Sequence, residues 1–174
     1  MSRIVLVRYG GVPEVARFQA DAPETFERGT RVVVNSHRGV ELGTVLEQAP
    51  PMEEDAQQET ADSSDQQHIM RRATEADEVC CAELRTECEG QFPKWCERIE
   101  NWGLQLELID LEWLLDKKKL ILYVLIDQPS ESANLAIRAA ASGFETVEVQ
   151  PVNAEGLVHA APTGKTCGSG GCCH

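Results

Sequence analysis

Residues 29–48 read GTRVVVNSHRGVELGTVLEQ, and this stretch decides the expected fold of the first part of the chain. Residues 32–35 and 40–46 are rich in valine and leucine, and the polar residues 36–39 separate them. Two short runs of β-prone residues around a glycine-containing turn are typical of a β-hairpin. We therefore expect two antiparallel strands here.

The strand pattern extends towards the N-terminus. Residues 4–9 alternate as a strand does, Gly10–Gly11 supplies a turn, and residues 15–18 predict a further strand. Short strands joined by tight turns, with no helix between them, predict a small, strongly bent β-barrel of SH3-like type over residues 1–48. The alternative is a β-meander laid against the second half of the chain.

An acidic stretch follows this first module. Residues 49–67 read APPMEEDAQQETADSSDQQ, with two prolines, six carboxylates and no basic residue. Such a segment has almost nothing large to bury, which is the compositional signature of disorder. We expect it to be a linker that divides the chain into two modules.

The second module is expected over residues 68–150 and begins with a helical pattern. Thr74 and Asp77 have the spacing of a capping box, with Asp in place of the usual Glu or Gln. Apolar side chains then recur at steps of three and four and define one helical face, formed by Leu84, Cys88, Phe92, Trp95, Ile99 and Trp102. Pro93 interrupts this pattern, so we expect a kink or two successive helices, closed by Gly103.

Strands follow the helix. Residues 104–116 and 120–126 are apolar enough to predict two strands, and a phase shift at 109–110 in the first indicates a β-bulge. Ser130 is expected to cap a second helix, and residues 144–149 predict a last strand. The order α–β–β–α–β predicts an α+β sandwich with both helices on one side of a small sheet.

Charge and motif content limit the function classes. The chain carries 16 Lys+Arg against 29 Asp+Glu, a formal net charge of −13, whereas nucleic-acid binding normally requires a basic face. Direct binding to RNA or DNA is therefore not expected. The sequence contains no G-x-S-x-G, P-loop, H-E-x-x-H or Rossmann pattern, so we expect a protein that is not an enzyme. No stretch has the length of a membrane span, and a cytoplasmic location is expected.

Residues 151–174 are expected to form a flexible tail that ends in a cysteine cluster. Cys167, Cys172 and Cys173 occur in the sequence CGSGGCC, and thiolates are the natural ligands of iron–sulfur clusters and of zinc. Adjacent cysteines suit a multi-iron cluster somewhat better than a tetrahedral zinc, which stays the alternative. Three thiols leave one ligand short, and His174, Cys96 or a partner chain could supply it. The competing interpretation is a tail whose thiols stay reduced or form an oxidisable dithiol.

The remaining cysteines are expected to serve packing. Cys88 lies on the apolar helical face, Cys96 is next to that face, and Cys80–Cys81 fall in the first turns of the helix. The histidines have no partner at ligand spacing and are expected on the solvated surface; those considered are His37, His68 and His159.

Several ordered blocks resemble a known family. RGVELGTVLE, RRATEADE and WCERIENWGLQLELIDLEWLLDKKKLILYVLID are together similar to the polymerase-suppressor C-terminal domain family, whose bacterial members are the YaaT/RicT-like proteins. Those relatives carry a C-G-x-x-x-C-C motif after the last strand, and residues 167–173 have the same spacing. The resemblance runs over most of residues 4–149 apart from the linker.

What the resemblance implies is an accessory protein without a hydrolytic site. Such proteins assemble with two small helical partners of the YlbF and YmcA type, are associated with iron–sulfur clusters, and act on an endoribonuclease that matures and turns over messenger RNA. By this resemblance, Cys167, Cys172 and Cys173 are cluster ligands.

Three functional hypotheses result. The leading one is a non-catalytic cytoplasmic adaptor with a tail that binds or senses iron–sulfur. The second is an RNA- or DNA-binding module, because small barrels and α+β sandwiches commonly bind RNA. The third is a thiol redox protein that uses the adjacent Cys172 and Cys173.

Overall fold

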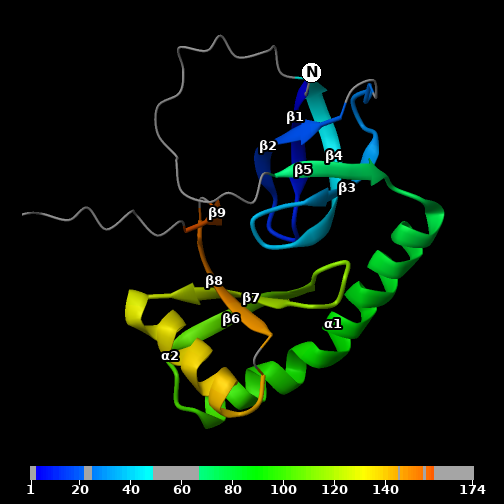
Figure 1. The fold of residues 1–174 in the computed structure, drawn as a ribbon. Helices are drawn as coiled ribbons and strands as arrows, with labels where there is room; N and C mark the ends of the chain where they lie inside the picture. Colours follow the sequence, from blue (N-terminus) through cyan, green and yellow to red (C-terminus); the bar gives the residue numbers. More distant parts are fainter. Residues whose placement is uncertain (1–2, 22–24, 49–66, 145, 155, 159–174) are drawn as a thin grey trace, which may run out of the picture.

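The computed structural model describes residues 3–21, 25–48, 67–144, 146–154 and 156–158. Within them the protein is a mixed α+β structure with two sheets and two helices (Figure 1). The elements are β1 (Arg3–Tyr9), β2 (Glu14–Ala20), β3 (Arg31–Asn35), β4 (Val40–Gln48), β5 (His68–Arg72), α1 (Glu75–Asn101), β6 (Leu106–Trp113), β7 (Leu120–Ile126), α2 (Pro129–Ala141), β8 (Val147–Asn153) and β9 (Gly156–Leu157).

The first sheet closes into a barrel in the order β1-β2-β5-β3-β4. The expected hairpin is confirmed, because β3 and β4 are antiparallel with Val32 opposite Gly43 and Val34 opposite Glu41. Inward side chains from the strands form the barrel core, which contains Val5, Val7, Tyr9, Phe18, Ala20, Phe26, Val32, Val34, Val45 and Ile69.

The fifth barrel strand comes from beyond the acidic stretch. β5 is antiparallel to β3 and pairs with β2 in parallel through Gln19 and His68. Residues 68–72, expected in the second module, are part of the barrel because they hydrogen-bond with β2 and β3. Residues 49–66 of the expected linker lie outside the described residues.

α1 begins and ends as the sequence indicates. The Thr74 hydroxyl accepts a hydrogen bond from the Asp77 backbone at 3.3 Å, and the Asp77 carboxylate accepts one from the Thr74 backbone at 2.7 Å, so the capping box is confirmed. Pro93 lies inside one helix, and the alternative of two successive helices is wrong. Gly103 has a φ of +66°, the left-handed conformation that commonly follows a helix C-terminus.

The second sheet has the order β6-β7-β8-β9. The register of β6 against β7 shifts between Leu108 and Asp110, which confirms the expected bulge. α2 begins at Pro129 after Gln128, so the predicted cap at Ser130 is wrong; the fixed φ of proline suits the first helical position. The last long strand, β8, starts at Val147, three residues later than expected, and β9 pairs with it.

The two faces of the second sheet have different neighbours. Both helices pack on one face, around Trp95, Leu122 and Leu135. The other face is directed towards the barrel, where Tyr123 packs in a smaller cluster that includes Val12 of the β1–β2 turn. The sheet therefore lies between the helices and the barrel (Figure 1). Within the described part of the chain, no helix is both long enough and apolar enough to cross a bilayer.

Candidate functional site

A buried ion pair lies where the barrel meets the second sheet. The Arg38 and Glu41 side chains, on the β3–β4 hairpin, are only 1% and 3% exposed. Arg38 Nε and Nη2 donate to the two carboxylate oxygens of Glu41 at 3.1 and 2.5 Å. The Ser36 hydroxyl donates to Glu41 Oε1 at 2.5 Å. Burying charged side chains costs free energy unless they are paired, so the hairpin is stable only because each charged group has partners.

The same network reaches across to the second sheet. Arg38 Nη1 donates to the hydroxyl of Tyr123 on β7 at 2.7 Å, and this hydroxyl in turn donates to the carboxylate of Glu112 on β6. Arg38 Nη1 also lies 3.8 Å from Glu112 Oε2. Nearby, the Leu115 backbone amide donates to the Val40 carbonyl at 2.9 Å. These contacts fasten the hairpin of the barrel to two strands of the second sheet.

The ionisation properties of this network indicate a structural role. Burial raises the pKa of Glu41, although Arg38 and Ser36 pull it back. Burial and the neighbouring Glu112 raise the pKa of Tyr123 far above its ordinary value, so its hydroxyl stays protonated. A hydroxyl that cannot ionise is a poor acid–base catalyst near neutral pH, and the Glu41 carboxylate accepts hydrogen bonds from Arg38 and Ser36. The arrangement instead holds the two modules in one geometry.

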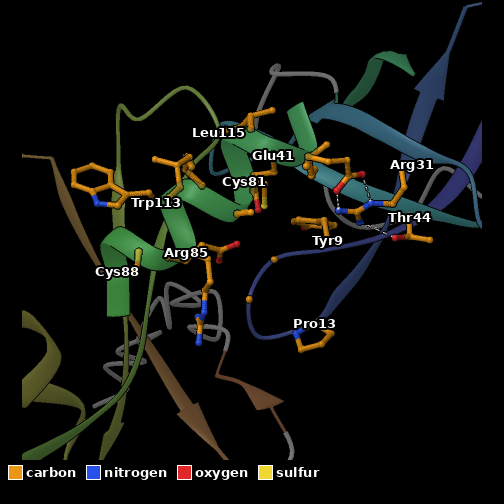
Figure 2. Close-up of a pocket in the computed structure, with 18 of the residues that line it drawn as sticks. Tyr9, Pro13, Arg31, Glu41, Thr44, Cys81, Arg85, Cys88, Trp113 and Leu115 are labelled. Atoms are coloured by element: carbon orange, nitrogen blue, oxygen red, sulfur yellow. Dashed lines mark hydrogen bonds and ion pairs between the residues drawn. The ribbon is translucent and has the colours of Figure 1, made fainter. Parts of the chain in front are cut away.

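A cavity of about 570 Å³ opens beside this network, between the barrel and α1 (Figure 2). The barrel contributes residues of β1, β3, β4 and the β1–β2 turn, and the second module contributes α1, the end of β6 and residues 114–115. Much of its wall is apolar and comes from Leu42, Leu84, Leu111, Leu114, Leu115 and Ala82. Figure 2 shows Cys81, Arg85 and Cys88 of α1 on one side of this space, with Arg31 and Thr44 of the barrel on the other.

Charged side chains line part of the cavity, and most are already paired. Arg31 Nε and Nη2 donate to the two oxygens of Glu78 at 2.8 and 3.2 Å, and Arg31 Nη1 donates to the Thr44 hydroxyl at 2.9 Å. Arg85 donates to both oxygens of Asp110 at 2.9 and 2.8 Å. These two arginines connect α1 to the barrel and to β6, respectively.

Two thiols also line the cavity. Burial is the main cause that raises the pKa of both Cys81 and Cys88, so both thiols are protonated near neutral pH. Because the thiolate is the nucleophile and the metal ligand, neither side chain has the properties of a reactive cysteine. The expected packing role of Cys88 is confirmed, since it is 2% exposed and belongs to the core of the second module.

The metal ligands expected from the sequence are not placed. Cys167, Cys172 and Cys173 lie outside the described residues, as do His159 and His174. Cys96 is exposed on α1, at the rim of the helix and not in the core. His37 and His68 are exposed as expected, and His37 Nδ1 lies 3.5 Å from the Tyr9 hydroxyl. Among the described residues, no group of three His, Cys, Asp or Glu side chains has metal-binding geometry.

Neither the buried pair nor the cavity is expected from the sequence. Residues 36–39 form the polar turn that the sequence predicts, but Ser36 and Arg38 in it are buried. One signal was present: Glu41 occupies an inward position of β4, in register with Val34 of the barrel core. A carboxylate at such a position needs a cation, and Arg38 lies three residues earlier.

Comparison of the chain with family models, with curated proteins and with solved structures found no match.

Proposed function

We propose that this protein is a non-catalytic cytoplasmic adaptor whose folded body presents a fixed surface to protein partners. The observation that carries this proposal is the Arg38 network, in which the buried polar groups at the module junction are hydrogen-bonded to one another and hold the two modules in one geometry. Such a clamp keeps surfaces of both modules in a constant relation, as simultaneous contact with a partner requires. We also propose that the barrel is of SH3-like type and that the second module is an α+β sandwich.

α1 offers a surface for such a partner. It joins the two modules, because Glu78 near its start pairs with Arg31 of the barrel while Trp95 and Ile99 pack on the second sheet. Several carboxylates along the helix are exposed, namely those of Glu75, Glu83, Glu89, Glu97 and Glu100. A partner with basic side chains complements this charge. By the resemblance given above, the partners are small helical proteins of the YlbF and YmcA type and an endoribonuclease of messenger RNA maturation.

We also propose that Cys167, Cys172 and Cys173 bind an iron–sulfur cluster. Three thiolates among glycines suit such a cluster in donor type, and the fourth ligand comes from a partner, from His174 or from the exposed Cys96. Bound there, the cluster would supply a redox- and oxygen-sensitive centre. The adaptor would then respond to the state of the cluster.

The test is metal analysis of protein prepared without oxygen. Iron, acid-labile sulfide and zinc are measured in the wild type, in a variant with Cys167, Cys172 and Cys173 changed to Ser, and in the control Cys80→Ser. We expect iron and sulfide in the wild type and the control and neither in the triple variant. Stoichiometric zinc without sulfide would show that the protein binds zinc and not an iron–sulfur cluster. Metal retained by the triple variant would show that the tail cysteines are not its ligands.

The adaptor role is tested separately by binding. The same three proteins are mixed with purified partners of the YlbF and YmcA type and with the endoribonuclease, and complex formation is measured by size-exclusion chromatography with light scattering. We expect a stoichiometric complex with these partners, and no nuclease activity in the isolated chain. Hydrolysis by the isolated chain, or the failure of all three proteins to bind, would refute the adaptor role.

A further inference from the structure

We propose that the cavity between the barrel and α1 is a binding site for a small amphipathic anion, with an apolar body and a single carboxylate, sulfonate or phosphate head. This inference goes beyond the adaptor function and does not depend on the cysteine tail.

The size and position of the cavity are those of a ligand site. Its volume of about 570 Å³ falls within the range of roughly 300–1,000 Å³ that is usual for small-molecule pockets. It lies at the boundary between two modules, where such pockets preferentially occur. Both sides are held in place, because Arg31 ties α1 to the barrel and Arg38 ties the hairpin to the second sheet. The space is therefore preformed, which lowers the entropic cost of binding.

The apolar part of the wall sets the body of the ligand. Leucines from three different segments meet here: Leu42 from β4, Leu84 from α1, and Leu111 from β6. The protonated thiols of Cys81 and Cys88 add to this surface, since an uncharged cysteine behaves as a small hydrophobe. A compact aromatic or branched aliphatic body of the ligand would lose its contacts with water and gain contacts with these apolar side chains.

The charges of the lining set the sign of the head group. Each carboxylate in the lining already accepts hydrogen bonds: Glu41 from Arg38, Glu78 from Arg31, and Glu112 from Tyr123. A cationic ligand would therefore have to displace an existing partner.

Arg8 differs from these groups. It belongs to the lining, lies opposite Thr44 of β4 in the strand register, is exposed, and forms no ion pair or side-chain hydrogen bond with any residue that the structure describes. Its guanidinium has five donors suited to a planar anionic group. Among the described residues of the lining, the one charged side chain without a charged partner is thus positive, and it shares the cavity with the apolar wall.

The test uses two dyes that share one aromatic skeleton. 1-Anilinonaphthalene-8-sulfonate is anionic and N-phenyl-1-naphthylamine is neutral, and the binding of each to the full chain is measured by fluorescence titration. We expect one sulfonate site per chain in the wild type. Arg8→Ala should weaken binding of the sulfonate about tenfold, the usual effect of removing one charge-assisted hydrogen bond, and leave the neutral dye within about twofold. The control Arg3→Ala, on the same strand but outside the cavity, should change neither.

A second variant keeps the test decisive. Ala82→Trp, which changes an exposed residue of the cavity lining, should abolish binding of both dyes. Amide chemical shifts on adding the sulfonate should change at residues 42–44, 81–88 and 111–115, and circular dichroism confirms that each variant is folded. The variant with the tail cysteines changed to Ser should bind as the wild type does, which separates this inference from the cluster. Unchanged sulfonate affinity in Arg8→Ala, full binding in Ala82→Trp, or shift changes elsewhere would each overturn the proposal.

Discussion

Replacing Arg38 by Met should destabilise the protein more than any surface substitution. The change removes the donors at 3.1 and 2.5 Å to Glu41 and the donor at 2.7 Å to Tyr123. Glu41 would keep only the Ser36 hydroxyl as a side-chain partner while remaining 3% exposed. Removing one member of a buried ion pair typically costs about 3–5 kcal/mol, because the remaining charge stays in a poorly solvating environment. We expect a loss in this range in the free energy of unfolding at pH 7.5.

The loss should depend on pH, and its sign follows from Glu41. Without Arg38, the pKa of Glu41 in the folded state rises further above the ordinary value of 4.5, so the folded state of the variant binds the proton more tightly than the unfolded state. Stability from this source is fully present below about pH 4.5 and is lost as the pH rises through the folded-state pKa. The deficit of the variant relative to wild type should therefore be smaller at pH 5.5 than at pH 7.5, by at least about 1 kcal/mol.

The assay is urea denaturation followed by tryptophan fluorescence and by circular dichroism at both pH values. The control Arg85→Met removes an exposed arginine that also binds a carboxylate, and it should cost less than about 1 kcal/mol. The double variant Arg38→Met/Glu41→Leu should recover most of the lost stability, because an apolar pair can replace a buried ion pair. A loss below 1 kcal/mol in Arg38→Met, or a deficit that grows on acidification, would refute the reasoning.

Three further predictions concern single positions. Gly39→Ala should lower the free energy of unfolding by about 1–2 kcal/mol, because the φ of Gly39 is +141° and a new Cβ would lie 2.7 Å from a leucine methyl. Gly90 lies in open space within α1, so Gly90→Ala should raise the free energy of unfolding by about 0.5–1 kcal/mol. Thermal denaturation of the two variants measures both changes. Thr74→Ala should lower the free energy of unfolding by about 1 kcal/mol through loss of the helix cap, and an unchanged value in urea denaturation would contradict the capping geometry. In native protein, iodoacetamide should modify the exposed Cys96 well before the buried Cys88. Mass spectrometry of peptides over time measures this order, and earlier modification of Cys88 would contradict the prediction.

Local signals explain why much of the fold was predictable. The capping box, the apolar face of α1 and the β-bulge in β6 are encoded within a few residues of one another, so the sequence alone indicates them. The start of α2 was missed because two adjacent local signals compete there. Proline at the first helical position decided the outcome over a serine one residue later.

The candidate site was not predictable because it is made of contacts between distant segments. Arg38 and Tyr123 are 85 residues apart in sequence, and no local pattern indicates that they meet. The strand β5 is a similar case, since its partners are chosen by barrel closure and its own sequence, HIMRR, resembles a polar lead-in to a helix. Only the inward position of Glu41 offered a hint within a single hairpin.

The origin of β5 has a consequence for how the chain is made and cut. Because the barrel closes with a strand that follows residue 67, a nascent chain released only as far as residue 48 lacks one of the five strands and cannot complete the first sheet. Conversely, a single proteolytic cleavage within residues 49–66 would leave two fragments that still share a barrel. We expect such fragments to co-purify until a denaturant separates them.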